Sequence, residues 1–281
     1  MKKQIGKIAV SATALLFITL CGCVKDPYEG MVSVPDGTGG QMWVELYKDL
    51  PVSGFTSEGF SNEGQFVVYD SESYRAMRGV DVSEHQKGID WNAVREEDVE
   101  FAIIRAGYRG YSEGEIYTDE YFQQNVEGAL KAGLDVGVYF FSQATDESEA
   151  VEEAEYLLEL IEDYEISLPV FFDWEPMYEE GSRTAETDRA TLTDCCLAFC
   201  KTVKEAGYEA GVYFYRSLGY NHYELDKLSG LTFWAAAPGD YPDFYYAHRF
   251  WQYSYTARIS GIEADVDLDI LFVPKDAKDR E

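Results

Sequence analysis

The sequence has few basic residues, and this shortage restricts the partners that the chain can bind. Its 281 residues include 23 Lys and Arg against 52 Asp and Glu, which gives a formal net charge of −29 at pH 7. Nucleic acids are bound by cationic side chains that neutralise phosphates, so this balance argues against DNA or RNA as a partner. With 46% apolar residues, 24 Gly and 8 Pro, the composition is that of a globular protein with a full core.

The sequence also lacks long hydrophobic runs, which excludes a protein with several membrane spans. One short apolar run, residues 8–20, follows the basic residues Lys2, Lys3 and Lys7. A run of this length is too short for a permanent membrane helix, and its basic head is typical of an export signal. Residues 1–22 are therefore predicted to be a signal peptide that is absent from the mature fold.

A cysteine follows the apolar run directly. The sequence Leu20-Cys21-Gly22-Cys23 resembles the bacterial lipobox, in which cleavage before the last Cys is coupled to attachment of a diacylglycerol to its thiol. The resemblance implies that Cys23 is the lipid attachment site and that the protein is held in the cell envelope, on the outer side of a bacterial membrane. The alternative is an ordinary cleaved signal followed by a coincidental cysteine.

Cysteine and histidine are scarce, with five Cys and three His in the whole chain. Beyond Cys21 and Cys23 the cysteines are Cys195, Cys196 and Cys200. These three fall within six residues of one predicted helix, where disulfide geometry is poor, and no His stands at a metal-ligand spacing from them. We therefore expect three buried thiols and no metal site.

Composition divides the chain after the signal into four segments. Residues 23–40 are polar and turn-rich and are predicted to be a tether. In residues 41–76, strand-like runs at 41–47 and 65–69 flank a Gly- and Ser-rich stretch, which indicates a small β-hairpin element packed on the main domain. Residues 77–273 form the main domain, and residues 274–281 form a polar tail.

The main domain alternates short apolar runs with amphipathic stretches. Eight runs predict strands, at residues 78–83, 101–106, 135–141, 168–174, 210–215, 232–237, 249–254 and 266–272. Four stretches predict helices, at residues 91–97, 119–131, 148–164 and 188–206. This alternation implies a parallel sheet, and eight strands close into a barrel. Because the helices shrink after Tyr215, we predict an α/β fold, an irregular TIM-like (β/α)5(β)3 barrel with about five helices.

Two carboxylates end one of the predicted strands. Asp173 and Glu175 stand at i and i+2 after a run of apolar residues, so in an extended chain they point to the same side, roughly 6 to 7 Å apart at their Cα atoms. Like charges in a partly desolvated barrel mouth raise the pKa of one carboxyl, which then stays protonated as a general acid beside an ionised neighbour. Cleavage of a glycosidic bond needs such a pair. Asp81 and Asp267 join them if the first and eighth strands are neighbours.

Five motifs between Met77 and Phe272 resemble, in order and spacing, those of glycoside hydrolase family 25, the Chalaropsis-type lysozymes or N-acetylmuramidases. They are Asp81-Val-Ser-Glu-His85-Gln86 with Ile89-Asp90-Trp91, Phe101-Ala-Ile-Ile-Arg105-Ala-Gly107-Tyr108, Gly137-Val-Tyr139-Phe140-Phe, Asp173-Trp-Glu175, and Trp251-Gln252-Tyr253 with Val266-Asp267-Leu268. The resemblance implies hydrolysis of the β-1,4 bond between N-acetylmuramic acid and N-acetylglucosamine in peptidoglycan, without metal or cofactor. The family fold is an eight-stranded barrel with five helices.

The resemblance also implies a role for each acid. Glu175 matches the general acid, and Asp173 matches its charged companion, which is proposed in the family to orient the substrate's own N-acetyl group as internal nucleophile. Asp81 and Asp267 match the other two family acids. The last motif usually reads Asp-x-Asn, whereas here Asp269 replaces the Asn and adds a negative charge near the site.

Four further residues are candidates for substrate binding because they lie at predicted strand ends. The rings of Tyr139, Tyr213 and Trp251 could stack on sugars, and Gln252 could reach a hydroxyl or acetamido group. Packing within the barrel is the alternative for each of them.

Three functions are consistent with these features. The first is a membrane-tethered muramidase, expected to be a monomer that acts on peptidoglycan glycan strands. The second is a chitinase-like hydrolase of another N-acetylhexosamine polymer, since such enzymes also end a strand in Asp-x-Glu. The third is a non-catalytic lipoprotein that binds the cell wall. Retention of all four acids argues against the third, because binding alone does not need a protonatable Glu beside an Asp.

Overall fold

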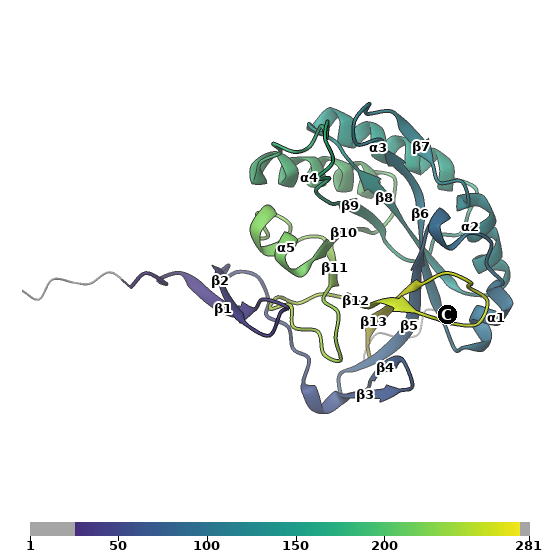
Figure 1. The fold of residues 1–281 in the computed structure, drawn as a ribbon, viewed down its shortest axis with the longest axis horizontal. Helices are drawn as coiled ribbons and strands as arrows, with labels where there is room; N and C mark the ends of the chain where they lie inside the picture. The colour runs from purple at the N-terminus through teal and green to yellow at the C-terminus, as the bar shows by residue number, and fades with distance from the viewer. Residues whose placement is uncertain (1–25, 276–281) are drawn as a thin grey trace, which may run out of the picture.

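The computed structural model describes residues 26–275, and an eight-stranded barrel accounts for most of them. The strands are β1 (Met31–Pro35), β2 (Gln41–Glu45), β3 (Phe60–Glu63), β4 (Phe66–Tyr69), β5 (Tyr74–Val82), β6 (Phe101–Arg109), β7 (Ile116–Thr118), β8 (Asp135–Ser142), β9 (Val170–Trp174), β10 (Ala210–Tyr215), β11 (Thr232–Ala236), β12 (Phe250–Ala257) and β13 (Val266–Pro274). The helices are α1 (Trp91–Glu96), α2 (Phe122–Lys131), α3 (Glu147–Ile161), α4 (Arg189–Glu205) and α5 (Arg216–His222). Helices α2, α3 and α4 cover the outside of the sheet, while β1 and β2 project to one side (Figure 1).

The barrel closes because β5 pairs with both β6 and β13. The hydrogen-bonded order around the ring is β5-β13-β12-β11-β10-β9-β8-β6, and β7 extends β6 outside it. All eight strands predicted for the main domain are present, and the four predicted helices plus α5 give five in the part of the chain that the structure describes. The predicted irregular (β/α)5(β)3 barrel is confirmed.

The prediction of a parallel sheet is wrong for one strand. β13 runs antiparallel to both of its neighbours, β12 and β5, while the other pairs in the ring are parallel. Only residues 258–265 separate β12 from β13, which is too short for the crossover that a parallel connection requires. The reversal brings Asp267, at the start of β13, directly opposite Asp81, near the end of β5.

Alternation along the strands divides the barrel into an inward and an outward face. One cluster of inward side chains fills the interior below the carboxyl ends of the parallel strands. It includes Met77, Phe101, Ile103, Phe171, Trp234, Phe250 and Leu271. The inward residues further along the same strands are polar, and they form the site described below. The outward face packs under the helices in a larger core.

Helices α3 and α4 each begin at an aspartate that caps their first turn. Helix α3 begins where the Asp146 carboxylate accepts hydrogen bonds from the backbone N–H groups of Ser148 (2.9 Å) and Glu149 (3.0 Å). Helix α4 begins similarly, with the Asp188 carboxylate accepting from the Thr191 N–H at 2.8 Å. The three free cysteines, Cys195, Cys196 and Cys200, lie on α4 and are buried as predicted.

The N-terminal region forms two hairpins, not the single one predicted. The runs at 41–47 and 65–69 do not pair with each other: β2 pairs with β1, and β4 pairs with β3. β1 also lies inside the segment 23–40 that was predicted to be a tether. The turn-rich stretch closes the first hairpin, because the Asp36 carboxylate accepts from the N–H groups of Thr38 (2.8 Å) and Gly40 (2.9 Å) while Gly37 adopts φ 82°.

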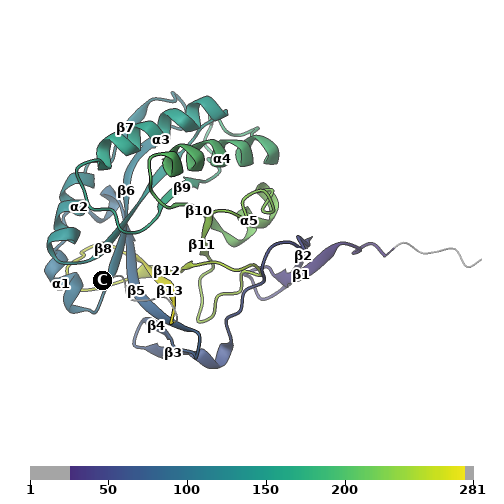
Figure 2. The ribbon, with the colours of Figure 1, turned by 180° about the vertical axis from the view of Figure 1, so that it is seen from behind.

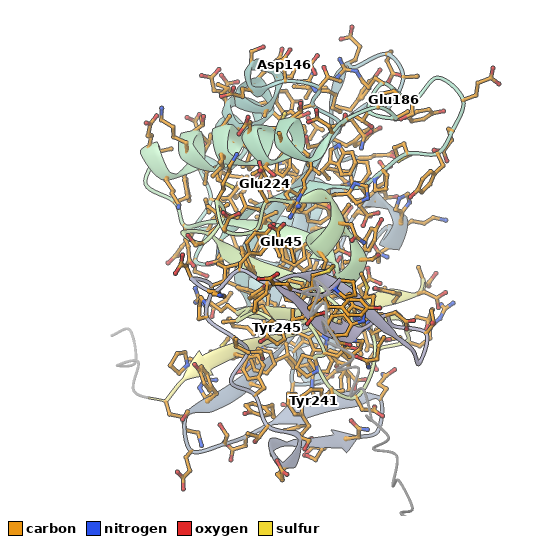
Figure 3. The ribbon with its side chains drawn as sticks, turned by 90° about the vertical axis from the view of Figure 1, so that its left-hand side faces the viewer. Glu45, Asp146, Glu186, Glu224, Tyr241 and Tyr245 are labelled. Atoms are coloured by element: carbon orange, nitrogen blue, oxygen red, sulfur yellow. The ribbon has the colours of Figure 1, made fainter. Side chains whose placement is uncertain are left out.

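The first hairpin is fastened to the barrel near β12. The backbone N–H of Tyr47 donates to the Tyr246 hydroxyl at 2.9 Å, and that hydroxyl donates to the Glu45 carbonyl at 3.1 Å. Figure 3, which faces this side of the molecule, shows Glu45 between Glu224 and Tyr245. Residues 31–47 are therefore part of the folded body.

The second hairpin covers a part of the barrel wall over which no helix lies in the described residues. Phe60 and Tyr69 pack against Phe272 with ring centroids 6.2 and 5.5 Å apart, and the Gln65 side chain donates to the Arg258 carbonyl at 2.7 Å. The view from behind likewise places β3 and β4 beside β5 and away from the helices (Figure 2). β3 and β4 thus cover the outward face of β12 and β13.

Two further predictions concern the ends of the chain. The signal peptide at residues 1–22 and the lipid attachment site Cys23 lie outside the described residues. So does most of the predicted polar tail, since β13 extends to Pro274. Within residues 26–275, no helix combines the length and apolarity needed to cross a membrane.

Candidate active site

A cavity of about 200 Å³ opens where the parallel strands end. It is lined by Asp81, Val82, Ser83, His85, Gln86, Arg105, Tyr139, Phe141, Asp173, Glu175, Tyr213, Trp234, Gln252 and Asp267. All four acids predicted from the sequence are in this list, and they come from β5, β9 and β13. The structure therefore brings together Asp81, Asp173, Glu175 and Asp267, which are up to 186 positions apart in the chain.

Asp173 and Glu175 owe their position to β9. Every residue of this strand is buried, and the alternation that turns Phe171 into the barrel also turns Asp173 inward. Glu175 follows the strand end and is half-buried. Its backbone carbonyl accepts a hydrogen bond from Gln143 Nε2 at 2.9 Å, so the loop after β9 is fixed to the loop after β8.

Asp81 and Asp267 are joined by Gln252. Nε2 of Gln252 donates to Asp81 Oδ2 at 2.7 Å and to Asp267 Oδ2 at 3.3 Å, while its Oε1 accepts from the Tyr213 hydroxyl at 2.9 Å. Gln252 was predicted to reach a substrate hydroxyl or acetamido group. In the structure its amide is already engaged by three side chains of the site, so it holds the acids in place.

Burial raises the pKa of every one of these four carboxyls. For Asp173, burial is followed by the charges of Glu175 and Asp81, while Arg105 opposes the rise in pKa. Burial likewise raises the pKa of Glu175, with the neighbouring Tyr213 hydroxyl opposing it. The pKa of Asp267 rises to about 9 through burial and the charge of Asp81. The cavity therefore favours the protonated form of its carboxyls.

Arg105 is a site residue that the sequence analysis did not single out. It lines the cavity, and its guanidinium pairs with Asp119 (Nε to Oδ2, 2.7 Å) and with Glu84 (Nη2 to Oε1, 3.1 Å). Its signal in the sequence is an Arg in the middle of an apolar strand, two residues after Ile103, which faces the barrel interior. It is the cation that limits the rise in the pKa of Asp173.

The predicted aromatic residues divide into two groups. Tyr139 and Tyr213 line the cavity as predicted, and Trp234, which was not predicted, lies beside Tyr213 with ring centroids 4.7 Å apart. The assignment of Trp251 to substrate binding is wrong. Its ring is fully buried against Phe60 and Phe272 on the outward face, and its Nε1 donates to the Ala237 carbonyl at 2.8 Å.

Asp269, the residue that replaces the usual Asn, lies below the cavity. It is fully buried, and its Oδ1 accepts a hydrogen bond from Trp234 Nε1 at 2.8 Å. Burial raises its pKa to about 7. Among residues 26–275, no cluster of His, Cys, Asp and Glu has the geometry of a metal site.

Comparison with known proteins relates the cavity to one family. The family model described as glycosyl hydrolases family 25 matches residues 80–262, a range that includes Asp81, Asp173 and Glu175 and ends before Asp267. The autolytic lysozyme of Clostridium acetobutylicum is 27% identical over 194 residues, which cover 69% of this chain and 55% of that protein. Lysozyme M1 of Streptomyces globisporus is 26% identical over 201 residues, covering 68% of this chain and 66% of that protein. The chain thus spans about half to two thirds of the length of these relatives.

Solved structures share the fold. The modular autolysin LytC of Streptococcus pneumoniae, in complex with a synthetic peptidoglycan ligand, superposes with a TM-score of 0.64 at 24% identity, covering 87% of this chain and 57% of that one. A family 25 glycosyl hydrolase of Bacillus anthracis superposes with a TM-score of 0.59 at 23% identity, covering 75% of this chain and 94% of that one. At these identities the likeness concerns the architecture of the barrel.

Proposed function

The chain belongs to the glycosyl hydrolases of family 25, and from this premise we propose that it is an N-acetylmuramidase. Its substrate would be the β-1,4 bond between N-acetylmuramic acid and N-acetylglucosamine in peptidoglycan. The observation that carries the proposal is the half-buried Glu175 in a cavity with three other carboxyls, where burial raises its pKa. Two curated relatives carry the name lysozyme.

In the proposed reaction Glu175 is the general acid. It gives its proton to the glycosidic oxygen as the bond from that oxygen to C1 of the muramic acid breaks. Half-burial suits this role, because it raises the pKa of the carboxyl, which still faces the cavity where the leaving oxygen would lie. The resulting carboxylate then takes a proton from the water that attacks C1.

Asp173 is positioned to act on the N-acetyl group of the same sugar. Its Oδ1 is buried in the cavity wall and accepts no hydrogen bond from the described residues. An acetamido N–H would supply the missing donor and would direct its carbonyl oxygen towards C1 as internal nucleophile. Positive charge that develops on the sugar is stabilised by the carboxylate.

Release of new reducing ends from purified cell walls tests the proposal. The wild-type protein is expected to release them with N-acetylmuramic acid at the new end, as identified by mass spectrometry. Glu175→Gln is expected to lose about a thousandfold in rate, because a side chain that supplies the acid proton typically contributes 10²–10⁴-fold. Glu153→Gln is the matched control, since it replaces another buried glutamate that lies on α3 and not in the cavity.

The alternatives give different results in the same experiment. Faster cleavage of chitin than of peptidoglycan would identify the chitinase-like enzyme. Binding to walls with no release by the wild-type protein would identify the non-catalytic lipoprotein. Equal release by the wild type and by Glu175→Gln would remove Glu175 from its role.

We also propose that the mature protein is a lipid-anchored monomer on the outer side of a bacterial membrane. The lipobox-like sequence before Cys23 supports the anchor. Mass spectrometry of the N-terminal peptide from the expressed full-length chain is expected to find a diacylglycerol on Cys23, and an unmodified Cys23 would contradict the anchor. Sedimentation of the delipidated protein is expected to give one chain per particle.

A further inference from the structure

Asp269 is a carboxyl whose hydrogen bonding is incomplete. It lies on the inward face of β13, opposite Gly79 of β5 and Gln252 of β12. Its Oδ1 accepts from Trp234 Nε1 at 2.8 Å, but its Oδ2 is buried and receives no N–H or hydroxyl donor from the described residues. A buried carboxylate oxygen without a donor is costly, so the arrangement requires a proton at this oxygen.

The group placed to supply that proton is Asp81. It lies two residues beyond Gly79 on β5 and faces the same way, and its side chain is in hydrogen-bonding contact with that of Asp269. Asp81 Oδ2 is occupied by Gln252 Nε2 at 2.7 Å. Two carboxyl groups can form a hydrogen bond only if one of them is protonated, since both ionised forms are acceptors.

We propose that Asp269 is a positioning residue that shares one proton with Asp81, so that the two carboxyls together carry a single negative charge beneath the catalytic cavity. The proton lies in an O–H···O hydrogen bond between Asp81 and Asp269 Oδ2. This bond fixes the carboxyl plane of Asp81, and Asp81 in turn fixes Gln252, Tyr213 and Asp267.

The charged and titratable groups around the pair set the pH at which its proton is lost. They are Asp267 on β13, Asp173 and Glu175 around the end of β9, Arg105 on β6, Tyr139 on β8 and Tyr213 on β10, with Tyr253 on the opposite face of β12. Arg105 is the cation among them, and Asp119 and Glu84 already pair with it. Once the shared proton dissociates, two adjacent anions repel each other and the hydrogen bond that orients Asp81 is gone.

An asparagine at position 269 would reproduce the protonated pair without a titrating group. Its carbonyl oxygen can accept from Trp234 Nε1, and its amide N–H can donate to Asp81, which leaves one negative charge on the two side chains. Asp269→Asn therefore keeps the shape and hydrogen bonds of the protonated pair and removes only its titrating proton. The inference about activity rests on the proposed function, whereas the inference about the proton does not.

The test compares the wild type, Asp269→Asn and Glu155→Gln, which replaces an exposed glutamate on α3 outside the cavity, as full chains purified in detergent. Reducing-end release from cell walls is measured at about pH 5 and about pH 8, and the unfolding temperature is followed over the same range. The ratio of activity at the higher pH to that at the lower pH is expected to be at least about threefold greater in Asp269→Asn than in the wild type. The ratio in Glu155→Gln is expected to equal that of the wild type.

Unfolding provides the readout that does not depend on activity. Because the pKa of Asp269 is raised in the folded state, its stabilising contribution is complete below the unfolded pKa and is lost as the pH rises through about 7. The unfolding temperature of the wild type should therefore fall more steeply with pH than that of Asp269→Asn. If Asp269→Asn does not fold, Asp81→Asn should flatten the same dependence, since its amide can donate to Asp269 Oδ2.

Equal pH ratios together with equal pH dependence of unfolding in the wild type and Asp269→Asn would overturn the shared proton. Failure of the proposed function looks different. No protein would then release reducing ends at any pH, while the flatter unfolding profile of Asp269→Asn would still support the shared proton.

Discussion

The protein contains two groups of acids that differ in how their charge is balanced. On α3, the buried Glu153 and the exposed Glu152 bind one guanidinium, with Arg109 Nε to Glu153 Oε1 at 2.7 Å and Arg109 Nη2 to Glu152 Oε2 at 2.8 Å. In the cavity, Asp81 and Asp173 face other carboxyls, and the neighbouring Arg105 is already paired with acids outside this group.

The α3 acids stabilise the fold, whereas the cavity acids can take part in catalysis. The α3 acids lie between elements and are matched by a cation, which is how a chain keeps buried charge. The cavity acids are kept close together at the expense of stability, and burial first and then the neighbouring charges raise their pKa values. Substitutions in the two groups should therefore have opposite consequences for activity and stability.

The largest effect is expected for Asp173→Asn. Loss of the carboxylate should lower the rate on peptidoglycan about 10³-fold, because the developing positive charge loses its partner. The unfolding temperature should stay the same or rise, since one repelling carboxyl has been removed from a buried cluster. A fall in stability that accounts for the loss of rate would place Asp173 with the structural acids.

The second largest effect is expected on stability, when the cation of the α3 group is removed. Arg109→Leu leaves Glu153 fully buried without its partner, and the free energy of unfolding should fall by about 3 kcal/mol. Denaturant titration measures this loss. The double substitution Arg109→Leu with Glu153→Leu should recover part of it, and no recovery would show that the pair contributes through packing and not through charge.

The cavity acid Asp267 should contribute to the pH dependence of stability. Asp267 has a pKa raised to about 9 by burial and by the charge of Asp81, so its stabilising contribution is present at low pH and is lost as the pH rises towards 9. Asp267→Asn should therefore weaken the fall in unfolding free energy between about pH 5 and about pH 9 by about 1–2 kcal/mol. A dependence as steep as that of the wild type would contradict the raised pKa.

The smallest effect is expected for Trp251→Phe. Removal of the indole N–H that donates to the Ala237 carbonyl should cost about 1 kcal/mol of stability. The KM for peptidoglycan should stay within about twofold of the wild type, since this ring faces outward. A large rise in KM would return Trp251 to the substrate site.

Much of the fold follows from patterns in the sequence. The eight barrel strands and helices α1 to α4 could be placed because each is a local apolar run or an amphipathic stretch of sufficient length, whereas the short α5 was not placed. The direction of β13 depends on the length of a connection, and residues 258–265 are too few for a crossover. β1 was missed because its turn-rich surroundings resemble a linker, and its pairing with β2 depends on a turn closed by Asp36.

The site could be predicted where the sequence shows which side chains of a strand face the barrel interior. Asp81, Asp173, Glu175 and Asp267 converge because each lies near the end of a strand that opens onto one cavity. Trp251 and Gln252 are adjacent on β12, so only one of them can face inward, and the alternation that admits Gln252 excludes Trp251. The contact between Asp81 and Asp269 depends on the pairing of distant strands, which one sequence does not reveal.

The protonation state of Glu175 tests the central claim most directly. With carboxyl-labelled glutamate, nuclear magnetic resonance follows each Glu side chain through a pH titration, and the signal of Glu175 is the one missing from Glu175→Gln. The account predicts that the pKa of this carboxyl lies above the ordinary glutamate value of about 4.3. A titration at or below that value would mean that the cavity does not hold the proton that the reaction needs.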